Sequence, residues 1–150
     1  MSFKSGFIAL IGAPNVGKST LLNTLLGQKI SIVSSRPQTT RNRILGVKHF
    51  SGGQFIFLDT PGILEPKGLL NKAIIQVSLQ SLSDVNLIIV LIEPFTTHFL
   101  IPDDLQLRLS KTNTPIFLAI NKIDLVDKRN LLPIIAEASQ SFPFKHRCRL

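Results

Sequence analysis

The feature that most constrains the fold is a glycine-rich octet between an apolar segment and a helical one. Residues Gly12–Ser19 have the sequence GAPNVGKS, which fits the pattern G-x-x-x-x-G-K-[ST], and the apolar run Phe7–Ile11 leads into it. A helix is predicted over Lys18–Leu26, ending at Gly27, because glycine can take the left-handed conformation that closes a helix. In such a loop, backbone N–H groups and the positive end of the following helix can bind a negatively charged group. We therefore predict a phosphate-binding loop.

Two side chains in this loop have expected roles of their own. Lys18 is expected to reach the β- and γ-phosphates, and the Ser19 hydroxyl to coordinate Mg²⁺. The alternative is a plain glycine-rich turn with a surface lysine, which the flanking strand and helix disfavour. The residues expected to contact the nucleotide here are Gly12, Ala13, Pro14, Asn15, Val16, Gly17, Lys18, Ser19 and Thr20.

Apolar and helical segments alternate along the rest of the chain. Runs at Ile44–Phe50 and Gln54–Asp59 flank Ser51-Gly52-Gly53, which predicts an antiparallel hairpin. Further strands are expected over Asn86–Ile92 and Ile116–Ile120, and helices over Leu69–Leu82, Asp103–Ser110 and Leu131–Ser141. This alternation predicts an α/β fold of the P-loop NTPase type, with three layers and a mostly parallel sheet containing one antiparallel strand. Ligands bind such sheets at the carboxyl ends of the strands.

Composition favours a single domain in the cytoplasm. The chain has 150 residues, 44% of them hydrophobic, which is enough for one core. The apolar run Val85–Ile92 is far shorter than the roughly 20 residues of a membrane-spanning helix, and we expect no transmembrane segment and no signal peptide. A single cysteine, Cys148, excludes an internal disulfide and offers no metal-ligand spacing.

The charge balance favours a polyanionic partner. There are 17 Lys and Arg against 9 Asp and Glu, a formal net charge of +8. Nucleotide phosphates, RNA and an anionic membrane surface all fit, so peripheral association at the inner membrane is an alternative that charge allows. Lys145, Arg147 and Arg149 lie in the last six residues, so part of the excess belongs to the C-terminal end. Charge is therefore weak evidence for RNA.

A second motif predicts which base is bound. Asn121-Lys122-Ile123-Asp124 follows the strand Ile116–Ile120, on the rim where a base would lie. The Asp124 carboxylate can accept hydrogen bonds from N1–H and the N2 amino group of guanine, and adenine offers no matching donors. Asn121 is expected to tie this loop to the phosphate loop, and the Lys122 stem to lie along the base. The motif predicts GTP and GDP as ligands and argues against an ATPase.

A third motif follows the apolar strand Phe55–Leu58. Asp59 is expected to hold Mg²⁺ through a water molecule, and the Gly62 N–H to contact the γ-phosphate. Thr60 and Pro61, between them, complete the expected nucleotide contacts. An Asp before Pro-Gly is equally typical of an ordinary turn, and only the other two motifs favour the functional interpretation.

A polar segment without periodicity, Ser34–Arg43, lies between the first helix and the hairpin. A threonine here could complete the Mg²⁺ shell when the γ-phosphate is present and so order the segment. Thr40 is the first choice for this ligand and Thr39 the second. The alternative is an ordinary solvated loop.

Together these motifs resemble the Era family of bacterial ribosome-assembly GTPases, within the translation-factor-related GTPases. The resemblance runs from about Phe7 to Phe144, and Lys29–Ser34, leading to the double threonine, is particularly similar. It implies GTP hydrolysis with Mg²⁺. In complete members it also implies a C-terminal KH domain that binds the 3′ end of small-subunit ribosomal RNA.

The resemblance also bears on catalysis. Ile63 follows Gly62, where Ras-like GTPases have a glutamine that orients water. Some GTPases resembling Era instead use K⁺ held by the phosphate-loop asparagine, here Asn15. The expected catalytic residues are thus Lys18, Asn15, Thr40 and Gly62, and the expected metal ligands are Ser19, Thr40 and Asp59.

The C-terminal end departs from the family pattern. Phe142-Pro143-Phe144 passes into Lys145–Leu150, which has neither an apolar strand nor a Ser-Ala loop. We expect an incomplete GTP-binding domain over 1–144 and a basic tail over 145–150, with the last strand and helix missing. A KH domain is not expected, because no two glycines are spaced as its Gly-x-x-Gly loop requires. The alternative function is a fragment that binds guanine nucleotide poorly, with little or no hydrolysis or RNA binding.

Overall fold

A single sheet organises the part of the chain that the computed structural model describes, namely residues 3–13, 15–27, 43–59, 82–94, 103–141 and 146–149. The sheet has six strands in the order β2-β3-β1-β4-β5-β6. The strands are β1 (Lys4–Gly12), β2 (Arg43–Phe50), β3 (Gly53–Asp59), β4 (Leu87–Ile92), β5 (Ile116–Ile120) and β6 (His146–Arg149). The helices are α1 (Lys18–Leu26), α3 (Asp103–Lys111) and α4 (Leu131–Ser141), with short 3-10 turns η1 (Leu82–Asp84), η2 (Ile123–Leu125) and η3 (Lys128–Asn130).

The strand directions confirm the predicted fold class. β2 and β3 form the expected antiparallel hairpin, and its turn contains Gly52 at a φ of 85°. All other neighbouring strands are parallel. β1 begins at Lys4, earlier than the apolar run suggests, because its polar first residues pair in register with β3 from Gly53 onward.

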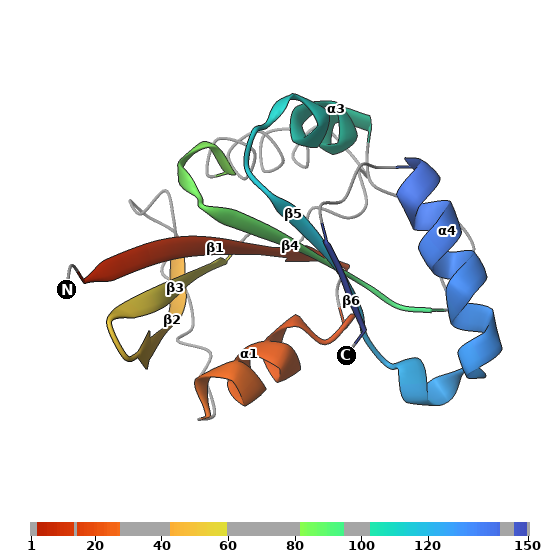
Figure 1. Cartoon of the computed structure of the whole chain (residues 1–150), viewed down its shortest axis with the longest axis horizontal. Helices are drawn as coiled ribbons and strands as arrows, with labels where there is room; N and C mark the ends of the chain where they lie inside the picture. The colour runs from red at the N-terminus through yellow and green to blue at the C-terminus, as the bar shows by residue number, and fades with distance from the viewer. Residues whose placement is uncertain are drawn as a thin grey trace.

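Alternating side chains divide the core into two faces. On one face Ala9 and Ile11 of β1 share a buried cluster with Leu109 of α3 and Ala138 of α4. On the other face Ile8, Leu10 and Phe57 pack with Leu22 of α1. Figure 1 shows the resulting layers, with α1 on one side of the sheet and α3 and α4 on the other. The period of two along each strand is the reason that one strand serves both layers.

The C-terminal end corrects one expectation. We expected residues 145–150 to be a tail and the last strand to be missing, and this was wrong. His146–Arg149 forms β6, parallel to β5, with Phe117 opposite His146 and Ile120 opposite Arg149. An edge strand needs backbone pairing on one side only, and charged residues are common there, so the lack of an apolar run did not exclude a strand. The edge of β5 that faces away from β4 is therefore paired with β6.

Several expectations fall on residues outside the described ones. They include the segment with Thr39 and Thr40, the residues from Thr60 to Ile63, and all but the last residue of the helix expected over Leu69–Leu82. In the ranges that are described, no helix is long and apolar enough to cross a membrane.

Candidate nucleotide-binding site

The loop after β1 has the backbone that its glycines make possible. Gly12 packs so closely on β4 that an added Cβ would lie 2.7 Å from the Leu91 carbonyl oxygen. Asn15 and Gly17 have φ values of 62° and 104°, in the left-handed region that glycine tolerates and most residues avoid. Val16, only 1% exposed, is buried with Leu91 and anchors the loop to the sheet.

The loop leads directly into the first turn of α1. Gly17 is the N-cap and offers no side-chain cap to the N–H groups of this turn. Such N–H groups, with the helix dipole, favour an anion at this end. Ser19 and Thr20 are exposed on the first turn.

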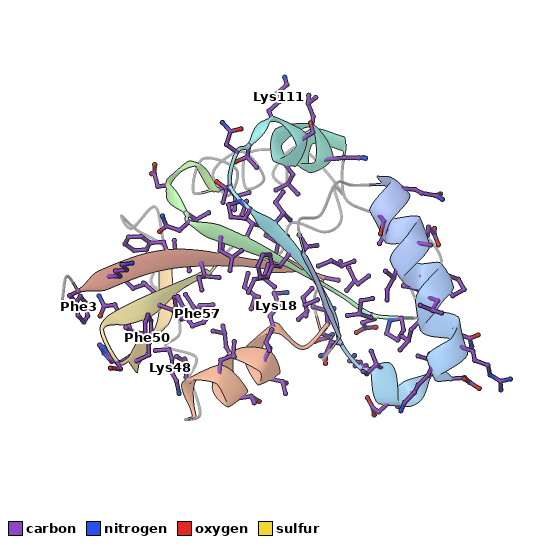
Figure 2. The ribbon with its side chains drawn as sticks, in the orientation of Figure 1. Phe3, Lys18, Lys48, Phe50, Phe57 and Lys111 are labelled. Atoms are coloured by element: carbon purple, nitrogen blue, oxygen red, sulfur yellow. The ribbon has the colours of Figure 1, made fainter. Side chains whose placement is uncertain are left out.

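Lys18 places positive charge across the loop. Its Nζ donates hydrogen bonds to the carbonyl oxygens of Gly12 at 2.8 Å and Ala13 at 2.7 Å. Figure 2 shows this side chain pointing from α1 toward the sheet. An ammonium held by loop carbonyls beside a helix N-terminus is a suitable countercharge for phosphate.

The loop after β5 lies against the phosphate loop. The Asn121 N–H donates to the Ile92 carbonyl at 2.9 Å, which extends the pairing of β5 with β4 by one residue. The Asn121 Nδ2 donates to the Val16 carbonyl at 2.9 Å, so this side chain joins the two loops as expected. Nδ2 would lie 2.1 Å from a Cβ added to Gly17, so the close approach depends on glycine.

The next residue makes a second connection. Lys122 has a φ of 57°, and its Nζ donates to the Asn15 carbonyl at 3.0 Å and to Glu93 Oε1 at 2.5 Å. Glu93 was not among the predicted site residues. Its position directly after the apolar strand β4 places it at the same carboxyl edge as Asn121, but this position does not distinguish it from any other acidic residue after a strand.

Asp124 and its neighbours form an exposed turn. Asp124 is exposed in η2, where the Leu125 N–H donates to the Lys122 carbonyl at 3.2 Å. Farther along, hydrogen bonds from the Arg129 side chain and backbone hold the pKa of the exposed Asp127 carboxyl below its ordinary value. That pair is open to solvent, with the Arg129 side chain 89% exposed and the Asp127 side chain 49% exposed.

The remaining predicted residues are only partly located. Asp59 is the last residue of β3, and its backbone lies opposite Leu10 of β1, near the same edge. Pro14, Thr40, Thr60, Pro61 and Gly62 lie outside the described residues. Among the residues that are described, no three His, Cys, Asp or Glu side chains group as a metal site. The arrangement thus brings together Lys18, Ser19, Asn121 and the backbone of Asp59 at the carboxyl edge.

Comparison with known proteins decides the family. A family model for the 50S ribosome-binding GTPase matches residues 7–122. The chain belongs to this GTPase family. Within it, the chain is 47% identical over 143 residues to GTPase Era of Geotalea daltonii, which confirms the resemblance to Era. That match covers 95% of the chain and 48% of the relative, so the chain spans about half the length of the curated relatives it matches.

Solved Era structures show the same architecture as this GTPase domain. Era in complex with MgGDPNP and nucleotides 1506–1542 of 16S ribosomal RNA has a TM-score of 0.76 and 41% identity, over 99% of this chain and 51% of that one. A variant of Aquifex aeolicus Era bound to GDP.AlF4- has a TM-score of 0.72 and 39% identity, over the same 99% and 51%. The P-loop GTPase fold is therefore confirmed.

Proposed function

We propose that this chain is a GTP-binding domain that hydrolyses GTP to GDP and phosphate. The observation that carries the proposal is the hydrogen bond between Asn121 Nδ2 and the Val16 carbonyl, 2.9 Å long. It joins a loop suited to phosphate to a loop suited to guanine, at the ends of strands in one sheet. The similarity to Era, whose solved structures hold guanine nucleotides, supports it.

The phosphates would be bound by the loop backbone and by Lys18. Its ammonium would exchange its carbonyl partners for phosphate oxygens, which are stronger acceptors because they are charged. The N–H groups at the start of α1 would donate to the same oxygens.

Mg²⁺ fits the oxygen donors at this edge. The Ser19 hydroxyl is exposed on the first turn of α1, and Asp59 ends the strand beside β1. Mg²⁺ prefers a few such donors together with phosphates and water, rather than a cage of carboxylates. Ser19, Asp59 and Thr40 would hold the ion, which would neutralise charge between the β- and γ-phosphates.

Hydrolysis on this site would depend on positioning and charge. Ile63 has no group with which to orient water. The Gly62 N–H would contact the γ-phosphate, and Asn15, exposed at the tip of the loop, would hold K⁺ as further positive charge.

Base selection would depend on the exposed Asp124. Its carboxylate would accept the two guanine hydrogen bonds, with Lys122 along the base and Asn121 fixing the distance to the phosphate loop. An exposed carboxylate can accept both bonds without the cost of burying a charge first.

The small ribosomal subunit is the proposed setting. The family description names the 50S subunit, whereas the solved Era complex holds 16S ribosomal RNA, which belongs to the small subunit. The chain is 41% identical to Era in that complex, which favours the small subunit. Its proposed location is the cytoplasm, where GTP and ribosomes meet. The rival idea of a feeble fragment assumed a missing strand beside β5, and β6 occupies that position.

Calorimetric titration with GDP, ADP and XDP tests the proposal. Loss of the charged hydrogen bonds in Lys18→Ala should weaken GDP binding by at least about tenfold. Lys111→Ala is a matched control, since Lys111 is an exposed lysine at the far end of α3 (Figure 2). Asp124→Asn should lose guanine and gain xanthine, because the amide can donate to the extra carbonyl. Equal affinity for GDP and ADP in the unaltered chain would contradict the proposal.

A further inference from the structure

Glu93 lies where three parts of the site converge. It follows Ile92, the last residue of β4, and β4 lies between β1 and β5 in the sheet. Its Oε1 accepts a hydrogen bond from Lys122 Nζ at 2.5 Å, and the two side chains are 28% and 36% exposed. The ion pair therefore connects the end of β4 with the base loop.

The same ammonium reaches the phosphate loop. Lys122 Nζ also donates to the Asn15 carbonyl at 3.0 Å. Over the described part of the chain, Asn15 and Lys122 are the only residues other than glycine with positive φ, at 62° and 57°. Such conformations are unfavourable for residues with a Cβ and persist where the surroundings hold them. The Lys122 ammonium thus links Lys122 to Asn15, the two residues whose backbone conformation is least favourable.

The hydrogen bond from Lys122 fixes the orientation of the Asn15–Val16 peptide in the phosphate loop. The Asn15 carbonyl and the Val16 N–H belong to one planar group, so fixing one fixes the direction of the other. That N–H lies 3.4 Å, measured from nitrogen, from the Ala13 carbonyl oxygen, and the Val16 carbonyl accepts the Asn121 side chain. The orientation of the Asn15–Val16 peptide therefore affects the loop that faces the phosphates.

We infer that Glu93 is a positioning residue for the nucleotide site. Its carboxylate holds the Lys122 ammonium against the Asn15 carbonyl, and through that contact it stabilises the phosphate-loop backbone. Without the carboxylate, the ammonium gains more from hydration than from one carbonyl and turns toward water, and the peptide at Asn15 becomes free to rotate. The inference rests on the proposed function only for its effect on nucleotide affinity.

A surface ion pair in the same chain gives the contrast. Most exposed pairs contribute little, and the Asp127–Arg129 pair, with side chains 49% and 89% exposed, is of this kind. The Glu93–Lys122 pair is more buried and its ammonium is shared with a strained loop. Glu93→Gln should therefore change the site, whereas Asp127→Asn, the matched control, should not.

The test combines GDP titration with amide NMR signals of Asn15 and Val16. Glu93→Gln should weaken GDP binding by about threefold to tenfold, which is the range for a partly exposed charged hydrogen bond. Adding the same change to Lys122→Met should have no further effect, because Glu93 acts through Lys122. Preference for GDP over ADP should stay unchanged in Glu93→Gln, since Asp124 is untouched. The amide signals should move in Glu93→Gln and Lys122→Met and stay in place in Asp127→Asn.

The outcomes separate this inference from the proposed function. Unchanged GDP affinity and unchanged amide signals in a folded Glu93→Gln would overturn the role of Glu93 and leave the proposed function standing. An additive double variant would overturn it as well. If the unaltered chain binds no GDP, the proposed function fails, and the amide signals still decide about Glu93. If a melting curve shows that Glu93→Gln does not fold, the Lys122→Met signals decide in its place.

Discussion

Replacing Gly17 by alanine tests the packing of the phosphate loop on the base loop. The φ of Gly17 is 104°, and a Cβ there would lie 2.1 Å from Asn121 Nδ2. Holding alanine at positive φ costs about 1–2 kcal/mol. The Asn121 amide would have to turn away and break its bond to the Val16 carbonyl, which costs about 1 kcal/mol more. We therefore expect the free energy of unfolding to fall by about 2–3 kcal/mol, and the Tm by about 5–10 °C.

Gly27→Ala is the control that isolates the clash. Gly27 also has positive φ, 69°, but nothing lies within 4 Å of its added Cβ. This variant should show only the backbone cost and should bind GDP as the unaltered chain does. Thermal melts and GDP titrations of both variants measure the difference. Equal melting points and equal affinities for the two would refute the idea that Gly17 exists to admit Asn121.

Two further predictions concern the sheet edge and the cation. Removing residues 146–150 should lower the free energy of unfolding by about 2–4 kcal/mol, because β5 loses a few backbone hydrogen bonds to β6; an unchanged melting curve would mean that β6 does not form. GTP turnover should rise when K⁺ replaces Na⁺, and Asn15→Ala should abolish that rise while lowering the Tm only slightly, since Asn15 is exposed but its φ of 62° suits asparagine better than alanine; equal rates in the two salts would remove Asn15 from the catalytic residues.

Local patterns were enough to predict most of the fold. Continuous apolar runs predict the strands at Phe7–Ile11 and Ile116–Ile120, and a helix is predicted over Leu131–Ser141. The C-terminal end of α1 follows from Gly27, whose backbone freedom is a property of the residue itself, and its start follows from the phosphate-loop motif. The order of strands and helices then implied that the phosphate loop and the base loop share one edge of the sheet.

Tertiary structure alone decided what has no local signal. β6 consists largely of charged and polar residues, and it is a strand because β5 offers a free row of N–H and C=O groups in register with it. Glu93 looks like any acidic residue after a strand until the fold brings Lys122, 29 positions later, within hydrogen-bonding distance. The same holds for Gly17, where a Cβ would clash with the Asn121 side chain, a residue distant in the sequence. Pairing partners distant in sequence are set by topology, and a local pattern carries no record of them.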